Sequence, residues 1–193
     1  MRSVARGWNV GVLALVAAIG LGERVVAQLP PPAAWKDADA RTTRLPPSAF
    51  AELSAPLRAE LERRGCTIPQ TYAGRGPHNV VRGSLRSAGS QDVAVLCSRN
   101  RVSAILVFWA GDPASVATLA ERPDATYLQV VMPGQIGFSR QITIATPKAI
   151  GARLAAADAA SIAHDGLEDA FIEKGSSIWY WRDDRWQELP GSD

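Results

Sequence analysis

The densest group of residues that could do chemistry is the run HDGLED at positions 164–169. It holds one imidazole and three carboxylates within six residues. A histidine beside a carboxylate can act as a general base, which suggests a small exported hydrolase using His164 with Asp165 or Asp169. The oxygens of Asp165, Glu168 and Asp169 are also the hard ligands that calcium prefers, which suggests a calcium-stabilised structural domain.

The same segment has a simpler interpretation as a polar turn. Asp-Gly pairs are typical of turns, and Glu168 and Asp169 would then be solvated residues at the turn's exit. The spacing is not that of an EF-hand loop, and His78 is the only other histidine that could complete a transition-metal site. The chain contains no Gly-X-Ser-X-Gly motif for a serine nucleophile. We therefore expect no cofactor and favour a protein that is not an enzyme, with the hydrolase and the calcium domain as alternatives.

Three tryptophans near the C-terminus suggest a binding surface. Positions 177–182 and 185–189 have the composition of strands, and Asp183-Asp184 would form the turn between them. Side chains alternate along a strand, so Trp179 and Trp181 would share one face and Trp186 would lie opposite Trp181. Such rings can bind a protein or a carbohydrate partner, or they can cover the domain's own core. The principal hypothesis is a non-catalytic binding or interaction module that uses this face.

The N-terminus has the three-part pattern of a secretory signal peptide. Arg2 and Arg6 precede a 12-residue apolar run at 10–21, and Val-Val-Ala at 25–27 suits a cleavage site. A run of this length is too short to span a bilayer as a helix. We predict a periplasmic or secreted protein with no membrane insertion after cleavage, and an uncleaved anchor is the alternative.

Cys66 and Cys97 are the only cysteines in the chain. An even cysteine count in an exported protein favours a disulfide, and the bond would join a predicted helix end to a predicted strand. Two cysteines at this spacing also exclude a Cys-X-X-Cys redox motif and a cysteine-rich metal site.

The charge pattern excludes a nucleic-acid groove. The formal net charge is +2, but residues 1–27 contain three basic residues and one acidic residue, which leaves 18 of each sign in the remaining chain. Nucleic-acid binding requires clustered positive charge, and no basic cluster is present.

The elements that would position these residues suggest one folded unit. We expect a signal peptide over 1–27, a proline-rich extended linker over 28–47 and a single domain over 48–193. Phe50, Leu53, Leu57 and Leu61 have helical spacing, with Ser54 as the cap of a helix that ends near Arg64. Strands are predicted at 79–85, 92–98, 103–109, 126–131, 136–145 and 169–174, a helical turn at 115–120 and an alanine-rich helix at 147–163.

These elements predict an α+β fold. An N-terminal amphipathic helix would pack on a mainly antiparallel sheet of about six to eight strands. The apolar strand at 103–109 should lie in the middle of that sheet, because both of its faces are hydrophobic.

Two parts of the chain are faintly alike. DVAVL at 92–96 precedes ILVFW at 105–109, and DAFI at 169–172 precedes IWYW at 178–181. Each pair resembles one hairpin of an FG-GAP-type propeller repeat, although the Asp-rich calcium loop of such repeats is missing before Asp92. The resemblance implies two similar hairpins and no function.

Overall fold

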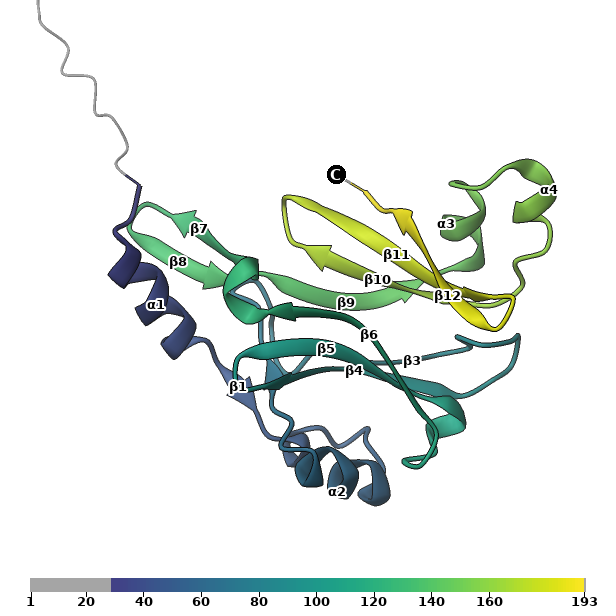
Figure 1. Ribbon diagram of the computed structural model, residues 1–193, viewed down its shortest axis with the longest axis horizontal. Helices are drawn as coiled ribbons and strands as arrows, with labels where there is room; N and C mark the ends of the chain where they lie inside the picture. Colours follow the sequence, from purple (N-terminus) through teal and green to yellow (C-terminus); the bar gives the residue numbers. More distant parts are fainter. Residues whose placement is uncertain (1–28, 193) are drawn as a thin grey trace, which may run out of the picture.

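Runs of apolar residues form two four-stranded sheets that make up most of the molecule (Figure 1). The computed structural model describes residues 29–192. The first sheet consists, in chain order, of β3 (Val80–Gly83), β4 (Asp92–Arg99), β5 (Val102–Phe108) and β6 (Val116–Pro123). The second consists of β9 (Arg140–Ala145), β10 (Gly166–Phe171), β11 (Gly175–Arg182) and β12 (Arg185–Pro190). All pairings are antiparallel, so each sheet is a meander.

The remaining elements are short. Two small sheets pair β1 (Arg44–Leu45) with β2 (Ile68–Pro69), and β7 (Leu128–Met132) with β8 (Gln135–Phe138). The α-helices within residues 29–192 are α1 (Pro32–Arg41), α2 (Ala55–Arg63), α3 (Pro147–Gly151) and α4 (Ala156–Ala159). Single 3-10 turns occur at Pro47–Ala49, Trp109–Gly111 and Asp124–Tyr127.

The two large sheets lie face to face, with α2 and α3 on their outer sides and with α1, β7 and β8 at one end of the molecule (Figure 1). One buried cluster joins Leu96 and Ile105 of the first sheet to Ile142 and Leu167 of the second. Two further clusters lie on the outer faces. Side chains of α2 pack with the first sheet, and Ile150 of α3 packs with the second.

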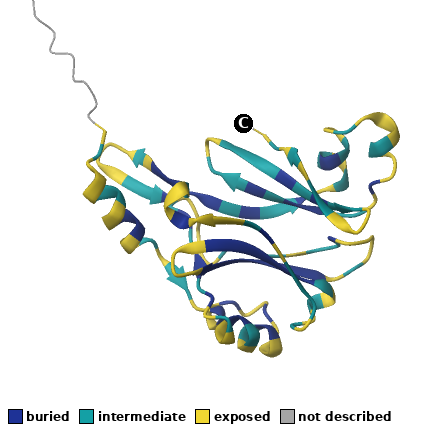
Figure 2. Cartoon of the chain, in the orientation of Figure 1, coloured by how far each residue is buried: buried dark blue, intermediate teal, exposed yellow. Residues whose placement is uncertain are grey.

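The first sheet has the more deeply buried centre. Seven of the eight residues of β4 and six of the seven residues of β5 are buried (Figure 2). Both strands are apolar on both faces, so each face can pack against another layer. β5 lies between β4 and β6, which confirms the predicted central position of this strand.

The predicted α+β architecture, one N-terminal helix on a single sheet of six to eight strands, is wrong. The described chain is mostly β, with four sheets of two to four strands and four short α-helices. One reason is that the segment predicted as a helical turn at 115–120 belongs to strand β6, and another is that the strands divide between two stacked layers. Hydrophobic periodicity identifies a strand but does not say which sheet it joins.

Two local predictions also differ from the structure. The alanine-rich segment predicted as one helix over 147–163 forms α3 and α4, with a break between them. Alanine favours a helix only weakly, and this segment must also place Ile150 and Ile162 against the second sheet. The Ser54 cap is confirmed, since its hydroxyl accepts a hydrogen bond from the Leu57 N–H.

The segment predicted as an extended linker, 28–47, contains a helix in its described part. Residues 32–41 form α1, and Ala38 is buried in the cluster between the sheets. Asp39 and Asp124 hold Arg44 between them, with nitrogen–oxygen distances of 2.7 Å on both sides. Burial and polar contacts therefore attach this segment to the fold. The predicted signal peptide lies outside the described residues.

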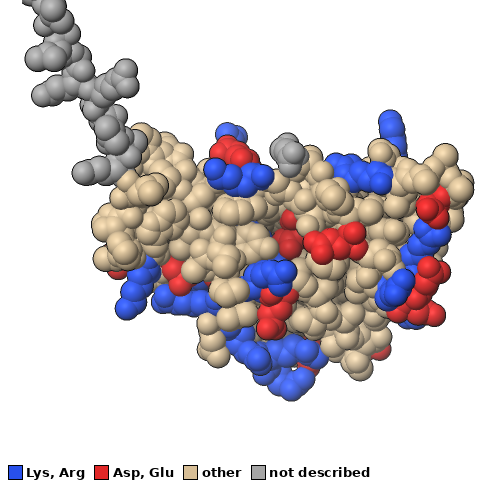
Figure 3. Space-filling model, turned by 45° about the horizontal axis from the view of Figure 1, so that its top comes forward, with Lys and Arg blue, Asp and Glu red and all other residues tan. Residues whose placement is uncertain are grey.

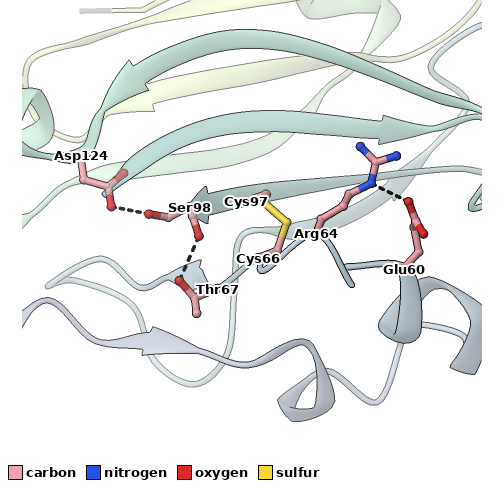
Figure 4. Close-up of a disulfide and its surroundings, with 7 residues drawn as sticks. All are labelled: Glu60, Arg64, Cys66, Thr67, Cys97, Ser98 and Asp124. Carbon is pink, nitrogen blue, oxygen red and sulfur yellow. Dashed lines mark hydrogen bonds and ion pairs between the residues drawn. A yellow bond between two sulfur atoms is a disulfide. The ribbon is translucent and has the colours of Figure 1, made fainter. Parts of the chain in front are cut away.

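The predicted disulfide between Cys66 and Cys97 is present and joins the loop after α2 to β4 (Figure 4). The two Cα atoms are 5.1 Å apart. Next to it, the Thr67 hydroxyl donates to the Ser98 carbonyl, and the Ser98 hydroxyl donates to Asp124. A covalent bond and a chain of hydrogen bonds thus connect α2 to the first sheet.

Among residues 29–192, no helix has both the length and the apolar character needed to cross a membrane.

Candidate functional site

The hairpin of β11 and β12 presents the aromatic row, by which we mean Trp179, Trp181 and Trp186. Trp181 lies directly opposite Trp186, as predicted. Asp183 and Asp184 both have positive φ, 52° and 55°, which is the conformation of the tight hairpin turn that matches strand twist. The turn therefore sets the register that brings these two indoles together.

Alternation along β11 separates two sets of side chains. Ile178 and Tyr180 are buried toward α3, on the outer face of the second sheet. Trp179 and Trp186 pack against the cluster between the sheets, and all three tryptophans of the row are partly buried. The row is therefore neither fully exposed nor a closed core.

A fourth tryptophan, from the first sheet, completes the aromatic group. Trp109 follows β5, and its ring stacks on Trp186 at 5.6 Å with an angle of 16° between the planes. It also meets Trp181 edge to face at 5.0 Å. This contact could not be predicted from the sequence, because Trp109 is far from both partners along the chain and no local pattern links them.

Trp181 lines an open cleft with a volume of about 510 Å³, which we call the Trp181 cleft. The Arg86 guanidinium lies over the rings, 5.7 Å from the centre of Trp181 and 5.6 Å from that of Trp109. A cation in this position is attracted by the ring faces. The full lining is Arg86, Ser161, Ile162, His164, Trp181, Arg182, Asp183 and Asp184. Two regions singled out in the sequence, His164 and the tryptophans, thus meet here.

Asp92 holds the wall of the Trp181 cleft in place. Its Oδ2 accepts hydrogen bonds from the backbone N–H groups of Leu85 and Arg86, at 2.9 and 3.1 Å. Its Oδ1 accepts one from the N–H of Ala110, at 2.8 Å. This buried carboxylate therefore orients the loop that carries Arg86 and the turn that carries Trp109. This role of Asp92 could not be predicted from the sequence, because an acidic residue at the start of a strand is usually solvated and its backbone partners come together only in the fold.

The His164 ring is not hydrogen-bonded to the carboxylate of Asp165 or of Asp169. Its Nδ1 lies 2.8 Å from the backbone oxygen of Asp165, and that contact requires Nδ1 to donate. The Asp165 carboxylate instead accepts the N–H of Ser84 at 2.9 Å, and the Asp165 N–H donates to the Ser84 carbonyl. Asp165 thus joins the two sheets at the edge of the cleft.

Asp169 and Glu168 point to opposite faces of β10. Asp169 forms a bidentate ion pair with the buried Arg140, at 2.9 and 2.8 Å. Glu168 accepts the Ser176 hydroxyl at 2.7 Å. Asp165, Glu168 and Asp169 therefore do not converge, and within residues 29–192 no group of three or more His, Cys, Asp or Glu side chains is placed to hold a metal ion.

The charges at the Trp181 cleft are nearly balanced. Arg182 donates to Asp158 at 2.9 Å, and this hydrogen bond raises the pKa of the guanidinium above its ordinary value. Asp183 and Asp184 add negative charge next to Arg86 and Arg182. Acidic and basic side chains are likewise mixed over the face shown in Figure 3.

Another cavity, of about 780 Å³, lies between α1, β8 and the loop around His78. The His78 ring is fully used within the fold: Nε2 accepts the Thr71 N–H at 2.8 Å, and Nδ1 lies 3.0 Å from the Gly76 carbonyl. The ring shapes its own loop and offers no free nitrogen to a ligand.

Comparisons of this chain with protein-family models, with curated proteins and with solved structures find no match.

Proposed function

We propose that the protein is an exported, non-catalytic binding module and that its ligand is a carbohydrate held in the Trp181 cleft. The observation that carries the proposal is the placement of Trp181. Its ring lines an open cleft, with the Arg86 guanidinium over it and the His164 ring in the same wall. An indole offers a flat apolar surface to a sugar ring, and the surrounding polar groups suit hydroxyl groups.

The size and polarity of the cleft favour a carbohydrate over a protein partner. A stable protein interface buries about 800 Å² on each side around an apolar centre. The Trp181 cleft is small and rimmed by charges, whereas the exposed apolar residues Val130 and Met132 lie on β7, outside its lining. The disulfide supports export, because such bonds persist in oxidising compartments.

The contacts of the carboxylates favour binding over hydrolysis. Asp169 is neutralised by Arg140, and Asp165 is occupied by a backbone N–H. Neither carboxylate hydrogen-bonds the His164 ring, so neither is placed to orient that ring as a general base.

The test is a glycan-array screen of the full-length protein, followed by titration of each hit with tryptophan fluorescence as the readout. We expect at least one glycan to bind, and Trp181→Ala to weaken its affinity at least tenfold. Trp35→Phe is the matched control, because Trp35 lies in α1 and outside the cleft lining. It should bind like the unaltered protein. A folded Trp181→Ala protein with unchanged affinity, or the absence of any glycan hit, contradicts the proposal.

A further inference from the structure

The two arginines of the Trp181 cleft differ in whether an acidic side chain neutralises them. Arg182 is paired with Asp158 at 2.9 Å and lies 3.7 Å from Asp183. Within residues 29–192, the Arg86 guanidinium forms no ion pair and donates no hydrogen bond. Arg86 is therefore the positive charge that the cleft can offer to a ligand.

Arg86 is held in position by contacts that do not use its side-chain donors. Its backbone N–H donates to the buried Asp92 carboxylate at 3.1 Å, and its guanidinium lies over the rings of Trp109 and Trp181. A guanidinium can rest on an aromatic ring and keep its donors, because its five N–H groups lie in its own plane. A side chain that is already held in place loses less entropy when it binds a ligand.

The donors of an arginine match a carboxylate. The planar fork of the guanidinium can form two parallel N–H···O bonds with the two oxygens of such a group. Among sugars, the hexuronic acids carry a carboxylate directly on the pyranose ring. The Arg86 guanidinium lies 5.7 Å from the centre of the Trp181 ring, so a sugar ring in contact with this indole has the guanidinium beside it.

Other polar groups of the cleft suit the hydroxyl groups of the same sugar unit. The His164 Nδ1 donates to the Asp165 carbonyl, so Nε2 of the neutral ring is an acceptor. Asp184 lies exposed in the hairpin turn and forms no ion pair within the described chain, and its two oxygens can accept from neighbouring hydroxyls. One unit that has a carboxylate and hydroxyls can therefore use Arg86, His164 and Asp184 together.

From these observations we infer that the carbohydrate is acidic, and that it carries a hexuronic acid unit whose carboxylate binds Arg86 in the Trp181 cleft. The inference rests on the proposed function, since it assigns a substrate class to the same cleft. Asp183 and Asp184 also line the cleft and would repel further negative charge. The cleft therefore suits one carboxylate on the bound unit, which is what a hexuronic acid has.

The experiment compares acidic carbohydrates with the same chains after their charge has been removed. The probes for calorimetry are oligosaccharides of galacturonic, glucuronic and mannuronic acid, and each has a control whose carboxyl groups are reduced to alcohols. A hydrogen bond to a charged group can change an affinity about tenfold. We therefore expect at least one acidic series to bind about tenfold more tightly than its reduced control, and added salt to narrow that difference.

Variants of Arg86 separate its charge and its geometry from the folding of the protein. Arg86→Gln should abolish the preference for the acidic form and change the affinity for the reduced form by less than about twofold. Arg86→Lys keeps the charge without the planar fork and should keep part of the preference. Arg185→Gln is the matched control, because it removes the same charge from an exposed position of the hairpin outside the cleft lining. It should bind like the unaltered protein.

The outcomes separate the acidic ligand from the proposed function. Equal affinity for the acidic and reduced chains, or an Arg86→Gln protein that keeps the full preference, overturns the acidic ligand and leaves carbohydrate binding in the Trp181 cleft standing. An equal loss of affinity in Arg185→Gln shows a general effect of charge and also overturns the role of Arg86. If no carbohydrate binds in either form, or if Trp181→Ala leaves binding unchanged, the proposed function itself fails.

Discussion

The two large sheets have the same meander topology but different surroundings. In the first sheet, β4 and β5 are buried on both faces, and a disulfide ties β4 to the chain that follows α2. In the second sheet, only Ile178 and Tyr180 of β11 are buried, every residue of β12 is at least partly exposed, and within residues 29–192 no disulfide crosses the sheet. We expect the first sheet to be the more rigid layer, because β4 and β5 are buried and tied by the disulfide, and the second sheet to present more of its strand residues to solvent. A binding surface is best placed where a rigid layer supports a layer that still has open edges.

Arg140 makes polar contacts with both large sheets. Replacing it is therefore the strongest test of whether the packing of one sheet on the other stabilises the fold. Arg140 lies fully buried in β9, pairs with Asp169 in β10, and donates to backbone carbonyls of Ser103 in β5 and Ala120 in β6. Its guanidinium also lies 4.6 Å from the centre of the Tyr127 ring.

We predict that Arg140→Leu destabilises the protein by about 3–5 kcal/mol, because Asp169 is left as a buried charge without its partner. Urea unfolding followed by tryptophan fluorescence measures the loss. The double variant Arg140→Leu/Asp169→Leu is the control and should recover part of it, since removing both charges removes the cost of the unpaired one. If the unfolding free energy of Arg140→Leu lies within about 1 kcal/mol of that of the unaltered protein, the contacts of Arg140 are not needed to hold the two sheets together.

The disulfide tests the role of the first sheet as the rigid layer. The bonded cysteines are separated by 31 positions. A loop of this size predicts about 3.7 kcal/mol of stabilisation in the chain-entropy model, so Cys66→Ala/Cys97→Ala should lower the unfolding free energy by up to that amount. Native-state hydrogen exchange should show the loss in β4 and β5, with the tryptophan emission wavelength unchanged. A shift in that wavelength would instead mean that the disulfide also shapes the aromatic row.

The smallest expected effect concerns the outer side of the first sheet. Hydrogen bonds from Arg63 and Arg64 lower the pKa of the Glu60 carboxyl from its ordinary 4.5 to about 2. A lowered folded-state pKa stabilises the protein above pH 4.5, and this contribution is lost as the pH falls toward 2. Glu60→Gln should therefore be slightly less stable at pH 7 and equally stable at pH 2, as measured by urea midpoints. A difference of the same size at both values would exclude an ionic origin.

Features that depend on neighbouring residues could be predicted from the sequence. The Ser54 cap, the Trp181–Trp186 pair and the central position of β5 each follow from local spacing. The disulfide followed from having only two cysteines. The similarity between the segments at Asp92 and Asp169 also has a structural counterpart, because β4–β5 and β10–β11 are the second and third strands of their sheets.

Features that depend on distant contacts could not be predicted. Charged residues are usually exposed, so nothing marked Arg140 as buried. The importance of Asp92 comes from backbone N–H groups that only the folded loop brings to it. A signal for α1 was available, because prolines at its start suit the first turn of a helix, but their number suggested a linker instead.

The position of α1 has a practical consequence for how the protein can be held. In Figure 1, α1 and the start of the described chain lie at one end of the molecule, and the turn between β11 and β12 lies toward the other. A surface attachment made through the N-terminal segment would therefore hold the protein by the end away from the Trp181 cleft. Immobilisation on a sensor chip should therefore use this end.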